Sequence, residues 1–113
     1  CAAHYKLNNL TAFVDFNGLQ IDGNIEDVMN PSPIDKKFEA FGWNALVIDG
    51  HNYDEIIDAI EKARNCKDMP TVIVCKTIKG KGVSFMENDA GWHGVAPSKE
   101  QCEKALAEIG GNR

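Results

Sequence analysis

A short oxygen-rich segment near the N-terminus has the residue types of a cation site. The apolar run Leu10–Phe16 leads directly into Asn17-Gly18, and Asp22-Gly23 follows a few residues later. At the end of a buried strand, an amide side chain and a main-chain carbonyl one or two residues further on can converge on a small hard cation. Mg²⁺ accepts such neutral oxygens together with one or two carboxylates and the phosphates of a ligand. The segment therefore predicts a cation and phosphate site.

The Asn17-Gly18 pair also permits a different interpretation. Asn-Gly between two apolar runs is typical of a type I′ hairpin, here joining Phe13–Phe16 to Leu19–Ile21. Asp22-Gly23 follows immediately and leaves a second arm too short to form a useful strand. The cation site is therefore favoured over the hairpin.

Two later segments carry groups suited to a phosphorylated ligand. In Lys79-Gly80-Lys81-Gly82 the glycines would let the backbone approach a phosphate, and a lysine adds a compact positive charge. This loop matches neither a Walker nor a dinucleotide fingerprint, so an ordinary turn is the alternative. In Gly91–Gly94 an imidazole, His93, lies between glycines with little local packing to explain it. A structural or simply exposed histidine is the alternative there.

Composition bounds the class of protein. With 113 residues, 43% of them hydrophobic and 26% charged, the chain is expected to be one domain or part of one. The net charge of −5 argues against a nucleic-acid surface, and no apolar run is long enough to predict a membrane span. Lys76 clusters with Lys79 and Lys81, which suits one small polyphosphate better than a polymer, and an ordinary solvated loop is the alternative. The four cysteines have no zinc-site spacing, so reduced thiols and a cytoplasmic location are expected.

The hydrophobic pattern predicts alternating strands and helices. Three short runs rich in Val, Ile and Phe suit strands covered on both faces, as in a parallel sheet. Between and after them, apolar stripes at helical spacing predict helices, with Ser32 and Ser98 as N-caps. The predicted strands are Leu10–Phe16, Asn44–Ile48 and Thr71–Lys76, and the predicted helices are the end of one over residues 1–9, then 33–42, 54–64 and 99–109. The fold class is therefore α/β, with a parallel sheet, flanking helices and ligands bound beyond the carboxyl ends of the strands.

These segments together resemble the transketolase family. The resemblance runs from Ala2 to about Ile109 and is strongest over Lys6–Gly23 and Pro70–Gly94. It implies that Asn17 gives a side-chain oxygen and Leu19 a main-chain carbonyl to Mg²⁺ or Ca²⁺. It also implies that Lys79 contacts thiamine diphosphate, and that His93 lies over the diphosphate, near the sugar substrate, with a catalytic role.

The resemblance also implies what else the enzyme needs. Residues 1–113 match the C-terminal part of the thiamine diphosphate-binding (PP) domain, and the family's upstream Gly-Asp-Gly, which supplies a metal-binding aspartate, would fall before Cys1. The length of the 79–93 loop resembles transketolases divided into two subunits, so a C-terminal subunit carrying the pyrimidine domain is the expected partner. The parent would transfer a two-carbon ketol unit between sugar phosphates, as in the pentose phosphate pathway, and the chain alone is expected to be inactive.

Two other functions compete with this one. Deoxyxylulose-phosphate synthase shares the cofactor chemistry, although the continuous match through the Lys79 loop favours transketolase. A non-catalytic α/β interaction module would keep the scaffold and lose the site. Whatever its function, the chain as given is expected to form homo-oligomers, because a truncated parallel sheet leaves unpaired backbone groups and apolar surface at one edge.

Overall fold

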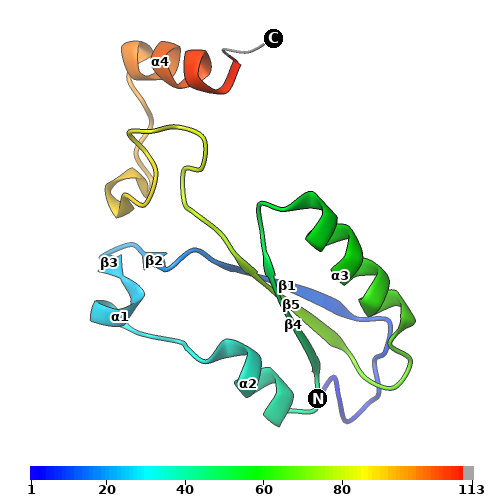
Figure 1. The fold of residues 1–113 in the computed structure, drawn as a ribbon. Coiled ribbons are helices and arrows are strands. Elements are labelled where there is room, and N and C mark those ends of the chain that lie inside the picture. Colours follow the sequence, from blue (N-terminus) through cyan, green and yellow to red (C-terminus); the bar gives the residue numbers. More distant parts are fainter. Residues whose placement is uncertain (111–113) are drawn as a thin grey trace. The chain divides into compact units, whose positions relative to one another are not determined.

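The main sheet contains three parallel strands in the order β1-β5-β4 (Figure 1). It is seen in a computed structural model that describes residues 1–110. The elements of this part are β1 (Thr11–Phe16), α2 (Ile34–Ala40), β4 (Asn44–Asp49), α3 (Tyr53–Asn65) and β5 (Thr71–Lys76). Strands and helices alternate along the chain, which confirms the predicted α/β class with a parallel sheet and flanking helices.

Strand β5 forms the centre of the sheet and of the core. Its residues Thr71–Val74 are buried, and Ile73 has no exposed surface. The register pairs Asp15 of β1 and Ile48 of β4 with the same residue of β5, Cys75. The prediction that the strands are covered on both faces is right for β5. It is wrong for β1, where every second residue is exposed and Phe13 keeps 54% of its surface in solvent.

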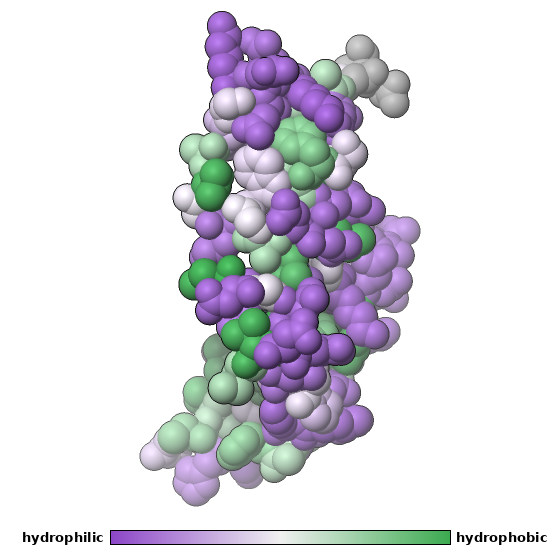
Figure 2. Space-filling view, turned by 90° about the vertical axis from the view of Figure 1, so that its left-hand side faces the viewer, coloured by the Kyte–Doolittle hydropathy of each residue, from purple (hydrophilic) through white to green (hydrophobic). Residues whose placement is uncertain are grey.

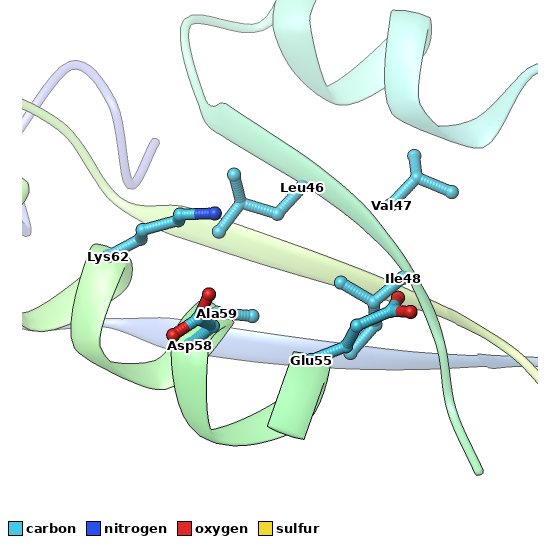
Figure 3. Close-up of a pocket in the computed structure, with 7 residues that line it drawn as sticks. All are labelled: Leu46, Val47, Ile48, Glu55, Asp58, Ala59 and Lys62. Carbon is cyan, nitrogen blue, oxygen red and sulfur yellow. The ribbon is translucent and has the colours of Figure 1, made fainter. Parts of the chain in front are cut away.

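The two helices lie on opposite faces of this sheet (Figures 1 and 3). Leu46 and Ile48 point toward α3, whereas Val47 points toward α2 (Figure 3). Helix α3 starts where Asn52 accepts hydrogen bonds from the backbone N–H groups of Asp54 and Glu55. This side-chain cap satisfies donors that the first turn of a helix leaves without partners.

A second compact unit consists of Gly18–Asn30 and the segment that begins at Ile78, whereas the first unit consists of Cys1–Asn17 and Pro31–Thr77. In the second unit β2 (Leu19–Gln20) and β3 (Gly23–Asn24) form an antiparallel hairpin that leads into α1 (Ile25–Val28). A 3₁₀ turn, η1 (Ala90–Trp92), precedes α4 (Lys99–Gly110). Ser98 caps α4 as predicted, because its hydroxyl accepts from the Gln101 N–H and the Gln101 side chain accepts from the Ser98 N–H.

Two local predictions need correction. Residues 2–6 form turns instead of the end of a helix, and Lys6 has φ 52°, a left-handed conformation that stops helical growth. Ser32 is not the cap of α2, because Pro33 is extended, with ψ 118°, and occupies the cap position itself. The hairpin alternative over Asn17-Gly18, which the sequence did not favour, is not formed, because β1 pairs in parallel with β5 and the antiparallel pair is β2-β3.

Large apolar side chains remain exposed on several elements. They include Phe13 on β1, Ile57 on α3 and Leu106 on α4. On the face drawn in Figure 2, hydrophobic residues in green lie among hydrophilic residues in purple. Among residues 1–110, no helix combines the length and the apolar character needed to cross a bilayer.

Candidate functional site

The carboxyl end of β1 places Asn17 at the edge of the sheet where parallel-sheet proteins bind ligands. Strand β1 ends at Phe16, and the Phe16 carbonyl accepts a hydrogen bond from the Thr77 N–H at 3.3 Å. A pocket of about 230 Å³ opens at this end of the first unit, lined by Phe16, Val74 and Lys76 together with the start of α2. Asn17 is half-buried and directly follows a lining residue of that pocket.

Leu19 lies in the β2-β3 hairpin of the second unit, paired with Asn24. The Gly18 carbonyl accepts a hydrogen bond from the Ile25 N–H at 3.0 Å, and the Gln20 side chain donates to the Met29 carbonyl at 3.3 Å. These bonds hold the segment after Asn17 in a defined backbone conformation. Such a conformation is needed if a main-chain carbonyl is to serve as a metal ligand.

Lys79 opens a compact loop. Its carbonyl accepts a hydrogen bond from the Asn88 N–H at 3.0 Å, which closes the loop, and Val83 inside it is 5% exposed. Gly80 has φ +73°, and a Cβ there would lie 2.5 Å from the Met86 carbonyl oxygen. Gly82 has φ +93° and no atom within 4 Å of the position a Cβ would take.

Glu87, an acidic residue of this loop, forms an ion pair with Lys81. Glu87 accepts a hydrogen bond from the Gly82 N–H at 2.9 Å and lies 3.8 Å from the Lys81 ammonium group. Lys81 is therefore paired within the loop, whereas Lys79 is half-buried near its start.

His93 directly follows η1 and is exposed. Its backbone N–H donates to the Ala90 carbonyl at 2.9 Å, which orders the turn. The preceding Trp92 packs edge-on against Phe85, with ring centroids 5.7 Å apart, and its indole N–H donates to the Phe85 carbonyl at 3.0 Å. The anchored tryptophan therefore supports the turn and leaves the imidazole accessible to a ligand.

The four predicted site residues fall into both units. Asn17 ends the first segment of the first unit, and Leu19, Lys79 and His93 belong to the second. Within residues 1–110, no group of three or more His, Cys, Asp or Glu side chains is arranged to hold a metal ion. The predicted ligands are an amide and a main-chain carbonyl, which such a grouping does not include.

A pocket in another part of the first unit lies between α3 and the face of β4 that carries Leu46 and Ile48 (Figure 3). It has a volume of about 190 Å³ and combines Leu46 and Ile48 with three charged residues of α3, Glu55, Asp58 and Lys62. Glu55 is already engaged, because it accepts from the Asp49 N–H at 2.8 Å and from the Asn52 amide at 3.1 Å. None of the predicted site residues lines this pocket.

A polar cluster on the α3 face of the sheet was not predicted from the sequence. The Thr77 hydroxyl donates a hydrogen bond to the Asp15 carboxylate, and Gly50 packs directly against Thr77 and Cys75. Burial raises the pKa of the Cys75 thiol, and the nearby Asp15 charge adds to the effect. The sequence signal was the polar Asp15 inside an apolar run, but its partner lies 62 residues away in the chain.

The chain belongs to the transketolase family. The family model described as "Transketolase, thiamine diphosphate binding domain" matches residues 1–112. Over 104 residues the chain is 41% identical to the 6-deoxy-6-sulfo-D-fructose transketolase subunit SqwG of Clostridium sp. (strain MSTE9), covering 92% of this chain and 38% of that protein. It is 40% identical over 105 residues to an apulose-4-phosphate transketolase subunit of Phocaeicola vulgatus, covering 93% of this chain and 37% of the relative.

The chain is also similar to one segment of longer transketolases. Human transketolase is 36% identical over 115 residues, covering 96% of this chain and 17% of the human protein. The crystal structure of transketolase from Campylobacter jejuni superposes with a TM-score of 0.86 at 34% identity, over 96% of this chain and 17% of that one. The chain thus spans less than two fifths of the subunit relatives and about a sixth of the full-length enzymes. The agreement in fold confirms the predicted partial α/β thiamine diphosphate-binding architecture.

Proposed function

We propose that these residues form the C-terminal part of the thiamine diphosphate-binding domain of an enzyme that transfers a two-carbon ketol unit between sugar phosphates. The match of the family model to residues 1–112 carries this proposal, because that model describes a thiamine diphosphate-binding domain. When bound, the cofactor supplies the carbanion chemistry of the transfer, and the protein supplies binding and orientation.

The chemistry of the donor set fits a metal-diphosphate group. Asn17 carries a neutral side-chain oxygen at the carboxyl end of β1, and Leu19 carries a main-chain carbonyl in the ordered segment after it. Mg²⁺ and Ca²⁺ prefer such hard oxygens, completed by a carboxylate and by phosphates. The carboxylate is proposed to come from a Gly-Asp-Gly in another part of the protein.

Lys79 and His93 have separate tasks in this proposal. The Lys79 ammonium group balances the charge of the diphosphate as a compact cation. The exposed His93 imidazole donates a hydrogen bond to charge that develops on a sugar oxygen, an interaction worth most where the donor is held in place before the reaction. The ordered turn after η1 provides such preorganisation.

The rest of the enzyme is proposed from the relatives. Two relatives are named as transketolase subunits, which supports a partner subunit with the pyrimidine domain. They are named for different sugars, although their identities to this chain are 41% and 40%. Similarity over these residues therefore does not choose the sugar. We propose that the chain alone is inactive and that the complete enzyme works in the cytoplasm.

Two substitutions test the assigned tasks in the complete enzyme. Asn17→Ala should weaken the apparent affinity for Mg²⁺ and thiamine diphosphate together, and saturating cofactor should recover part of the rate. His93→Ala should lower kcat by about 10- to 1000-fold, and the loss should persist at saturating cofactor. Steady-state rates across cofactor concentrations separate the two effects, with Lys79→Ala expected between them.

Matched controls are available on the same chain. Asn65 is an exposed asparagine at the end of α3, and His4 is an exposed histidine near the N-terminus. Asn65→Ala and His4→Ala should leave both cofactor affinity and kcat unchanged. If His93→Ala matched His4→Ala in kcat and in the KM for sugar, the imidazole would have no part in catalysis.

A further inference from the structure

The ends of β1 and β5 are joined by a side-chain hydrogen bond in addition to the backbone ladder. The parallel register pairs Asp15 with Cys75, and residues two apart on a strand share a face, so Thr77 lies on the same face as both. There the Thr77 hydroxyl donates to the Asp15 carboxylate. The Thr77 N–H also donates to the Phe16 carbonyl at 3.3 Å, which extends the β1-β5 ladder beyond its last pair.

Gly50 determines how Thr77 is oriented. A Cβ on Gly50 would lie 2.5 Å from the Thr77 methyl carbon and 2.8 Å from the Cys75 Cβ, so only a glycine lets β4 end so close to β5. The Gly50 N–H is also held by the Lys76 carbonyl at 2.8 Å. Because a threonine side chain has few allowed rotamers, a methyl group packed against Gly50 directs the hydroxyl toward Asp15. These contacts connect the ends of β1, β4 and β5.

The hydrogen bond between Thr77 and Asp15 lies close in sequence to two residues of the proposed site. Asp15 is two residues before Asn17, and Thr77 is two residues before Lys79. A binding site requires its ligands to be held within about 0.5 Å of the productive geometry, by groups that do not themselves touch the ligand. The bond joins the two strand ends at the last point before the chain leaves the sheet toward Asn17. A shift of β1 along β5 would displace Asn17 directly.

We propose that Asp15, Thr77 and Gly50 form a strand-end clamp that positions Asn17 for the metal-diphosphate group. The inference rests on the proposed function and assigns Asp15 and Thr77 as positioning residues that do not contact the cofactor. The clamp acts on the affinity for the metal and cofactor together, and leaves the chemical step of the saturated enzyme unchanged.

The test uses the full-length protein freed of metal and cofactor, with binding of thiamine diphosphate and Mg²⁺ measured by titration calorimetry. Thr77→Val keeps the shape of the side chain and removes the hydroxyl, whereas Thr77→Ser keeps the hydroxyl. Removing a group bonded directly to a metal ligand weakens metal binding by about 10- to 100-fold. Thr77 acts on Asn17 less directly, through Asp15, so Thr77→Val is expected to weaken binding several-fold, at most about 10-fold. Thr77→Ser should retain most of the affinity. Thr11→Val, at the exposed opposite end of β1, is the matched control and should bind like the wild type.

A double-mutant cycle separates the clamp from a general loss of structure. Asp15 is exposed, so Asp15→Ala should fold even if Thr77→Val does not. If both fold, each should weaken binding by a similar factor, and Asp15→Ala/Thr77→Val should weaken it no further, because the two residues act through one bond. Saturating cofactor should restore kcat in each variant.

Three results would overturn the clamp. The first is an unchanged affinity for thiamine diphosphate and Mg²⁺ in Asp15→Ala or Thr77→Val. The second is an equal loss of affinity in Thr77→Ser and Thr77→Val. The third is a double variant in which the losses of affinity of the two single variants multiply. A wild-type protein that does not bind thiamine diphosphate with Mg²⁺ would instead refute the proposed function, and the clamp with it. Binding by the wild type with no change in the single variants refutes the clamp alone.

Discussion

Replacing Gly50 by alanine should destabilise the sheet where its three strands end. The new Cβ would lie 2.5 Å from the Thr77 methyl carbon, 2.8 Å from the Cys75 Cβ and 3.2 Å from the Lys76 carbonyl oxygen. All three atoms belong to β5 or follow it directly, and that strand is hydrogen-bonded to a neighbouring strand on each side, so it has little room to move. Inserting a methyl group into packed structure costs about 1–3 kcal/mol. Alanine also restricts the unfolded chain, which returns about 0.4–1 kcal/mol. Taken at the middle of both ranges, the expected net loss is therefore about 1.3 kcal/mol.

Hydrogen exchange of the β5 amides in the full-length protein measures this loss locally. Exchange reports the free energy of opening for one part of a structure, so the result does not depend on how other domains unfold. Gly110→Ala is the matched control, because no atom lies within 4 Å of a Cβ there and its φ is not in the left-handed region. Protection of the β5 amides that stays equal or increases in Gly50→Ala would refute the packing argument.

Two further predictions concern titratable groups. Glu108 has a lowered pKa because the backbone N–H of Ser84 donates to its carboxylate at 2.5 Å, and the Ser84 hydroxyl donates at 2.9 Å. The contact between Ser84 and the ionised Glu108 is therefore complete above the ordinary glutamate pKa and is lost as the pH falls through the lowered pKa. The NMR shift of the Ser84 amide should titrate at a pH below the ordinary glutamate pKa. A titration at the ordinary glutamate pKa would contradict this prediction. Because the pKa of Cys75 is raised by burial and then by Asp15, iodoacetamide at about pH 8 should modify Cys75 more slowly than the exposed Cys1 and Cys102. Peptide mass spectrometry measures the rates, and equal rates at the three thiols would show that the environment of Cys75 does not protect it.

The strands and longer helices could be predicted because their local patterns agree with their tertiary environment. Residues 71–76 are apolar almost throughout, and the corresponding strand is buried at the centre of the sheet. The predicted stripe of α3 consists of Ile56, Ile57, Ile60 and Ala63. Ala63 is buried as expected, whereas Ile57 keeps 59% of its surface exposed. The β2-β3 hairpin was not predicted, since two-residue strands are too short to show an alternating pattern.

Helix starts were predictable only where a side chain decides them. Ser98 caps α4 through a reciprocal pair of hydrogen bonds with Gln101, and a serine followed three residues later by Glu or Gln is a local signal. Ser32 offered a similar local signal for α2. There the extended backbone of Pro33 delays the helix until Ile34.

Some residues of the candidate site could be proposed from the sequence, and others could not. The residues proposed to bind metal and cofactor could be named from the sequence because Asn17, Lys79 and His93 lie in short motifs that can be recognised along the chain. The strand-end clamp could not be predicted from local motifs, because Asp15, Gly50 and Thr77 come together only through the parallel pairing of three strands. Contacts at such sequence separations depend on register, which no single segment encodes.

The glycines of the Lys79 loop show why a motif has to be examined residue by residue. Both Gly80 and Gly82 have positive φ, but their surroundings differ. A side chain on Gly80 would collide with the backbone of Met86, so this glycine is required by the packing of the loop on itself. Gly82 has open space where its side chain would be, so its φ of +93° is what favours glycine at this position. The packing of the loop on itself therefore accounts for the first glycine, and the left-handed backbone whose N–H donates to Glu87 accounts for the second.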